Sequence, residues 1–101
     1  MEDTLFRKAF GDTPKIRVIE YLLELGELDC SLTDIAEGAE ISRTTLFRIW
    51  PDFLKSKLVI HTRKIGNAKL YKINPKNPIT KRLAEIFDEI LTKSVEELAT
   101  P

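Results

Sequence analysis

The chain has 101 residues, and its 16 Lys and Arg residues balance 16 Asp and Glu residues while 43% of the residues are apolar. This composition predicts one soluble globular domain with a core of its own. No run approaches the about 18 apolar residues of a membrane helix. Glu2 and Asp3 stand where a secretory signal would be basic, so we expect a cytoplasmic protein without a membrane partner.

The residue types that support catalysis or metal binding are scarce. Cys30 is the only cysteine and His61 the only histidine, which excludes an internal disulfide and a zinc cluster. There is no Gly-rich phosphate loop, no histidine beside a nucleophile and no pair of carboxylates framed by a pocket-forming length of chain. We therefore expect no enzyme, no cofactor and no metal.

The zero net charge conceals a division along the chain. Residues 1–40 contain four basic and ten acidic residues, and residues 83–101 contain one and five, whereas residues 41–82 contain eleven basic residues and only Asp52 as an acid. A concentrated basic segment can neutralise phosphates and release counterions. A basic run by itself is more often a solvated face, so its place in the fold must decide between the two interpretations.

The first half of the chain shows helix signals in succession. Apolar spacing predicts a helix over residues 4–10, and Thr13 followed by Pro14 begins a second over residues 14–25. A capping box of Ser31 and Asp34 begins a short third helix, which we expect to end before Gly38.

Ser42 then caps a longer helix over about residues 42–54. One stripe of this helix is apolar and is expected in the core, together with Cys30 as a small buried hydrophobe; it contains Leu46, Ile49, Trp50, Phe53 and Leu54. The other stripe is free. Pro51 removes a backbone hydrogen bond and clashes with the carbonyl group of Phe47, which predicts a kink or a break.

Two β-prone runs, 59–65 and 68–73, surround Gly66-Asn67, a pair suited to a type II′ hairpin turn. Pairing Ile65 with Ala68 brings Lys64 beside Lys69 at the tip, where like charges repel and an anionic partner would relieve them. The same register places Ile60 opposite Ile73 and Thr62 opposite Tyr71. The predicted core face of the hairpin contains Leu58, Ile60, Tyr71 and Ile73, and His61 is interpreted as a structural histidine.

Asn77 and Pro78 begin a long amphipathic helix over residues 79–98. Its apolar stripe contains Ile79, Leu83, Ile86, Phe87, Ile90, Leu91, Val95 and Leu98. The stripe is broader than one small domain can cover, so we expect a homodimer joined through this helix, with help from Leu5, Phe6 and Phe10.

The segment from Thr33 to Trp50 resembles the helix-turn-helix signature, and Leu58-Val59 with the following hairpin resembles the wing of winged helix-turn-helix proteins. This resemblance implies a mainly α fold with a small β-hairpin (α+β), in which residues 1–78 bind DNA and residues 79–101 form an extra dimerisation helix. In the family, the counterparts of five residues make the small core: Ile35, Ala36, Ile41, Leu46 and Ile49.

One position departs from the family. Glu40 stands in the turn where the family has glycine, and a left-handed backbone is unfavourable for glutamate, so either Gly38 moves the turn or the turn is wider. The whole chain is similar to archaeal winged-helix transcriptional regulators, which are commonly dimers. The absence of glutamine is typical of a thermophilic source.

In this family, the third helix enters the major groove of double-stranded DNA and the wing contacts the adjacent backbone or minor groove. Carried onto this sequence, the helix contacts are Ser42, Arg43, Thr44, Phe47 and Arg48, and the wing contacts are Arg63, Lys64, Asn67 and Lys69. The predicted function is sequence-specific DNA binding by a dimeric transcriptional regulator. The alternative is a winged-helix interaction module of a transcription or replication assembly, whose exposed helix face should be apolar or acidic.

Overall fold

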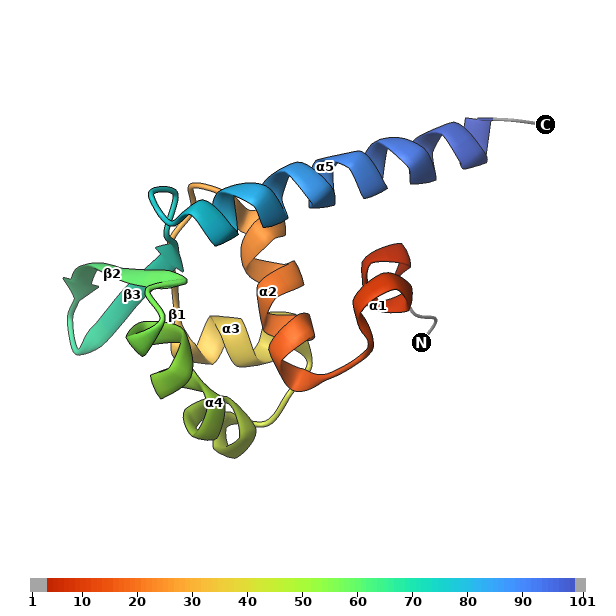
Figure 1. The fold of residues 1–101 in the computed structure, drawn as a ribbon. Coiled ribbons are helices and arrows are strands. Elements are labelled where there is room, and N and C mark those ends of the chain that lie inside the picture. The colour runs from red at the N-terminus through yellow and green to blue at the C-terminus, as the bar shows by residue number, and fades with distance from the viewer. Residues whose placement is uncertain (1–3, 100–101) are drawn as a thin grey trace.

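A computed structural model describes the backbone of residues 4–99 and the side chains of residues 4–93. Helices α2, α3 and α4 gather around a common core, a β-hairpin projects to one side, and α5 crosses α2 and extends well beyond the other elements (Figure 1). In chain order the elements are α1 (Leu5–Phe10), α2 (Pro14–Leu25), β1 (Cys30–Ser31), α3 (Leu32–Ala39), α4 (Arg43–Lys55), β2 (Val59–Ile65), β3 (Ala68–Ile73) and α5 (Pro78–Ala99). None of the helices in this part of the chain is both long and apolar enough to cross a bilayer.

The helix starts lie where the capping residues predict them. Thr4, Thr13, Ser31 and Ser42 each accept a hydrogen bond from a backbone N–H group in the first turn of the following helix. At α3 the capping box is complete, because the Asp34 carboxylate also accepts from the Ser31 N–H group at 3.2 Å. These side chains replace the partners that the first N–H groups of a helix lack.

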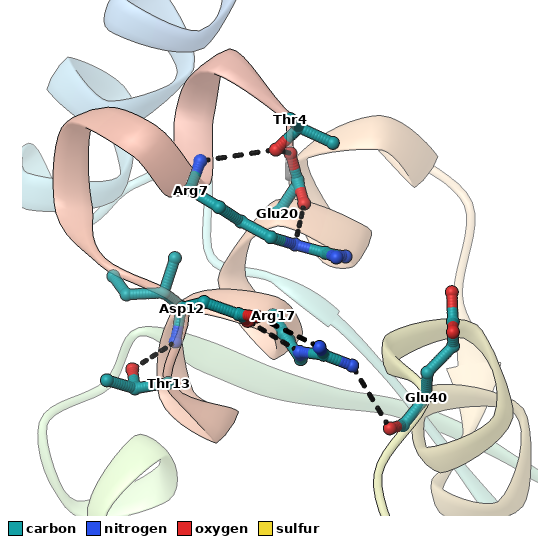
Figure 2. Close-up of polar contacts among 8 residues, drawn as sticks. Thr4, Arg7, Asp12, Thr13, Arg17, Glu20 and Glu40 are labelled. Carbon is teal, nitrogen blue, oxygen red and sulfur yellow. Dashed lines mark hydrogen bonds and ion pairs between the residues drawn. The ribbon is translucent and has the colours of Figure 1, made fainter. Parts of the chain in front are cut away.

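Helix α1 is held against α2 by a buried carboxylate. Glu20 is buried in α2; its carboxylate accepts from Arg7 Nε at 2.8 Å and from the Thr4 hydroxyl group at 2.6 Å (Figure 2). Both donors are needed, since a buried carboxylate without partners is strongly unfavourable. Phe6 lies near this ion pair, and the centroid of its ring is 5.8 Å from that of Phe87 in α5. Helix α1 therefore contacts both α2 and α5.

The turn between α3 and α4 is short, and Glu40 itself adopts the left-handed conformation, with φ 57° and ψ 46°. Both alternatives drawn from the sequence, a turn moved to Gly38 and a wider turn, are therefore wrong. Two hydrogen bonds hold Glu40 in this strained conformation. The Glu40 N–H group donates to the Glu37 carbonyl group at 3.1 Å, and Arg17 Nη1 donates to the Glu40 carbonyl group at 3.3 Å (Figure 2).

Gly38 lies inside α3, which continues past it to Ala39, and not at the helix end as expected. A Cβ atom at this position would lie 2.1 Å from Cε1 of Tyr21. The glycine therefore allows the ring from α2 to lie directly on the α3 backbone.

We expect Gly38→Ala to destabilise the protein. Alanine gains about 1 kcal/mol in helix propensity, but overpacking against Tyr21 costs about 1–3 kcal/mol, so the net loss should be about 1 kcal/mol in urea unfolding. In a Tyr21→Ala background the clash is gone, and Gly38→Ala should then stabilise. A stabilising effect in both backgrounds would show that the Tyr21 ring moves aside without cost.

Helix α4 runs unbroken through Pro51 to Lys55, so of the two outcomes predicted for Pro51, a kink or a break, the break is excluded. Proline leaves the carbonyl group four residues earlier, that of Phe47, without its helical donor. Phe47 and Pro51 are both exposed, so water can satisfy this carbonyl group and the helix tolerates the proline.

The main core lies between α4, α3, α2 and the base of the sheet. The predicted core is confirmed apart from Leu54: Leu46, Trp50 and Phe53 are buried, as are Ile35 and Ala36. Ile41 and Ile49 are half-buried against them, whereas Leu54 is exposed. Cys30 is also buried, and this burial, with smaller contributions from Asp34 and Asp29, raises the pKa of its thiol to about 11.

The hairpin has the predicted strands and the predicted turn. Gly66 has φ 59° while Asn67 does not have a positive φ, as in a type II′ turn. The register at the tip is also confirmed, with Ile65 opposite Ala68 and Lys64 opposite Lys69.

The register at the base of the hairpin differs by one residue, because a β-bulge lies between His61 and Arg63. His61 and not Thr62 is opposite Tyr71, and Val59 and not Ile60 is opposite Ile73. A one-residue shift exchanges the two faces of a strand, so Val59 is buried and Ile60 is only half-buried. The predicted core face was wrong in this respect.

The described sheet has a further strand that the sequence analysis did not predict. The two residues of β1 pair antiparallel with β3, Cys30 with Tyr71 and Ser31 with Leu70, which gives the order β1-β3-β2. This strand ties the hairpin to the start of α3.

Candidate nucleic-acid interface

The exposed side of α4 carries the side chains that the sequence analysis assigned to DNA. Arg43, Thr44, Phe47 and Arg48 are all exposed, and Phe47 has 55% of its surface open to solvent. Leu46 and Trp50 on the opposite side are buried, so core packing fixes the rotation of the helix about its axis and turns this face outward.

Two of the assigned α4 residues already have partners within the protein. The Ser42 hydroxyl group accepts from the Thr45 N–H group at 3.1 Å and donates to the Thr45 hydroxyl group at 2.9 Å. Arg43 Nη2 donates to the hydroxyl group of Thr33, in the first turn of α3, at 2.9 Å. In contrast, Arg48 forms no ion pair with any of the described residues.

The wing tip presents two cations side by side. Lys64 and Lys69 are cross-strand neighbours, both are exposed, and within residues 4–93 neither has an acidic partner. Asn67 in the turn is exposed as well. Like charges directly opposite each other destabilise a hairpin, and this pair is free to meet an anion.

A shallow groove connects the wing to the start of α3. It is lined by Thr33 and Leu32 on one side and by Asn67 and Lys69 on the other. Because Thr33 also binds Arg43, the wing tip, the α3 start and the first turn of α4 form one continuous surface. We call this surface, together with the exposed Phe47 and Arg48 on the same side of α4, the basic face.

Arg63 is positioned differently from the two lysines. Its Nε and Nη2 atoms donate to the Asp29 carboxylate at 2.9 and 3.2 Å, and the Thr62 hydroxyl group donates to the same carboxylate at 2.6 Å. These bonds lower the pKa of Asp29 to about 2, with the Arg63 hydrogen bond as the largest cause. On β3, Lys72 pairs with Glu27 at 2.8 Å.

Two residues that contact the predicted site residues, Thr33 and Asp29, were not predicted from the sequence. Thr33 could have been found from its place in the first turn of a capped helix that precedes the predicted DNA-contacting helix. Asp29 had no local signal, because its partner lies 34 positions along the chain. In the described part of the chain, no group of three or more histidine, cysteine or acidic side chains could hold a metal ion.

Solved structures of low sequence identity share the fold of this chain. The apo form of a double variant of ZitR from Lactococcus lactis superposes with a TM-score of 0.64 at 20% identity, over 91% of this chain and 71% of that one. Wild-type ZitR in complex with DNA superposes with a TM-score of 0.58 at 18% identity, over 81% of this chain and 58% of that one.

Sso10a-2, a DNA-binding protein from Sulfolobus solfataricus, gives a TM-score of 0.54 at 20% identity and covers 84% of this chain and 95% of that one. No protein-family model and no curated protein sequence matches the chain. Together, the order of the elements, the hairpin after α4 and these similarities show that the chain has the winged helix-turn-helix fold.

Proposed function

We propose that this protein binds double-stranded DNA sequence-specifically and acts as a dimeric transcriptional regulator. The observation that carries the proposal is the basic face, in which an outward-turned helix side and the wing tip are joined through Thr33 and the groove. An α-helix fits the major groove, and the wing then lies over the adjacent backbone. The two solved neighbours, one in complex with DNA and one described as DNA-binding, support the same function.

The chemistry of the basic face supports a division of labour. Arg48 has a free guanidinium group that can bind guanine bidentately, Thr44 can bond a base or a phosphate, and the exposed Phe47 ring can pack on a thymine methyl group. Lys64 and Lys69 are point charges suited to phosphates. An interaction module would instead present an apolar or acidic face here.

The test is selection of duplex DNA from a random pool, followed by fluorescence anisotropy over a salt series. We expect an enriched inverted repeat and an affinity that falls steeply with salt. Lys93→Ala is the control, since Lys93 is exposed on α5. Recovery of no motif, together with salt-independent affinity, would favour the interaction-module function instead.

We also infer that the protein is a homodimer. Phe87 is buried within the chain and Leu83 and Ile90 are half-buried, but Ile86 and Leu91 on the same helix are 41% and 47% exposed. Phe10 of α1 is exposed too. Val95 and Leu98, which complete the predicted stripe, lie outside the residues whose side chains are described. A second copy would cover this apolar edge isologously.

Light scattering should therefore give a mass of twice 11.6 kDa. Ile86→Asp and Leu91→Asp should each shift the mass toward that of the monomer, because they place charges in the interface without touching the buried Phe87. Lys93→Ala should leave the mass unchanged. A monomeric mass for the unaltered chain at tens of micromolar would contradict the dimer.

The setting of the protein is part of the same proposal. We infer a cytoplasmic protein without an enzymatic step, metal or cofactor, from an archaeal and heat-adapted source, which the absence of glutamine supports.

A further inference from the structure

Asp29 lies in the loop between α2 and β1, yet the hydrogen bonds that its carboxylate accepts from described side chains all come from the wing strand β2. Its carboxylate receives three of them, two from Arg63 and one from Thr62. The Asp29 side chain is only 16% exposed, whereas that of Arg63 is 62% exposed. An acidic residue from the N-terminal part of the chain is thus enclosed by β2.

The β-bulge explains how one carboxylate can receive both donors. Successive side chains of a regular strand point to opposite faces, so Thr62 and Arg63 could not both reach Asp29 from an unbroken ladder. The extra residue at the bulge is Thr62, whose single hydroxyl proton is directed to the Asp29 carboxylate at 2.6 Å rather than to the Leu70 carbonyl group at 3.2 Å. Bulges redirect side chains and bend a strand, and here the bend lies next to the acid.

A second ion pair attaches the other strand to the same loop. Glu27 accepts from Lys72 on β3 at 2.8 Å, and the following β1 pairs with β3. Both strands of the wing are therefore tied to residues 27–31. The tip beyond Arg63, with Lys64 and Lys69, has no such tie among the described residues.

We propose that Asp29 is a positioning residue for the wing and that its ion pair with Arg63, here called the strut, holds the hairpin in place. Lys64 and Lys69, and not Arg63, then bind the DNA backbone. This inference rests on the proposed function and changes the role that the sequence analysis gave to Arg63. The strut sets the angle of the hairpin to α3 and α4, and thereby places Lys69 at the groove beside Thr33, with Lys64 opposite it on the neighbouring strand. Because the pKa of Asp29 is lowered to about 2, the strut is charged at any pH used for DNA binding.

The test compares Asp29→Ala, Arg63→Ala and the double variant with Lys64→Ala on the selected DNA, by anisotropy over a salt series. Each strut variant should lower affinity several-fold, and the double variant should be no weaker than either, since both remove one interaction. The salt slope should stay unchanged for all three, whereas Lys64→Ala should reduce it by about one unit per lost phosphate contact in each subunit. Asp29→Asn, which keeps a hydrogen-bond acceptor, should recover part of the affinity.

Glu37→Ala is the matched control for Asp29→Ala, because Glu37 is exposed on α3 and each of these variants removes one negative charge. If Arg63→Ala reduces the salt slope as Lys64→Ala does, or if Asp29→Ala strengthens binding, then Arg63 binds phosphate and the proposal is wrong. If the unaltered protein binds no DNA at all, the proposed function fails separately. Hydrogen exchange of the β2 and β3 amides then still decides the strut, since Asp29→Ala and Arg63→Ala should accelerate it alike and Glu37→Ala should not.

Discussion

Leu46→Ala should lower the free energy of unfolding by about 2–5 kcal/mol, the usual cost of removing a large buried aliphatic side chain. The Leu46 side chain is completely buried on the inner side of α4. Its removal leaves a cavity between α4 and the rest of the main core. A domain of this size is stable by only about 5–15 kcal/mol, so the variant should unfold at a much lower urea concentration.

The neighbouring position supplies the control. Phe47 follows Leu46 directly in α4 but is mostly exposed, so Phe47→Ala should change stability by no more than about 0.5 kcal/mol. It should nevertheless weaken DNA binding, because the ring lies on the basic face. If the two variants lose similar stability, the assignment of the two faces of α4 is incorrect.

Arg48→Ala should cost about 1–3 kcal/mol on the selected site and remove the preference at one base position in each half-site, if the free guanidinium group binds guanine. Binding to scrambled DNA should fall much less. Arg43→Ala should have a smaller effect on base preference, because Thr33 already holds that guanidinium group. Anisotropy on selected and scrambled duplexes measures both.

The wing provides the contrasting case. Lys64→Ala and Lys69→Ala should weaken binding to all sequences alike and reduce the salt dependence, since phosphates carry no sequence information. If the lysine variants changed base preference and the Arg48 variant did not, the assignment of base contacts to Arg48 and of phosphate contacts to the two lysines would be wrong.

Local chemistry explains why so much of this fold could be predicted. A helix cap joins residues three positions apart, and a type II′ turn depends on Gly66 and Asn67 alone, so the helix starts and the hairpin tip were correct. The 3.6-residue period also separated Leu46 from Phe47 correctly. The outward face of α4 and the paired lysines of the wing tip followed from these local rules.

Contacts between distant residues decided the rest. Glu40 accepts a left-handed backbone because Arg17 and the end of α3 hold it there, and Gly38 is needed because a ring from α2 lies on it. The bulge that shifts the base register lies where Asp29 binds the wing.

The sequence was sufficient to predict where the helices begin, which side of α4 faces outward and which charges lie at the wing tip, because these depend on neighbours a few positions away. The register at the base of the wing, the pairing of β1 with β3 and the partner of Arg63 became evident only in the folded chain. The physical reason is that Asp29 and Arg63 are 34 positions apart, and no periodicity or turn signal connects residues that only the folded chain brings together.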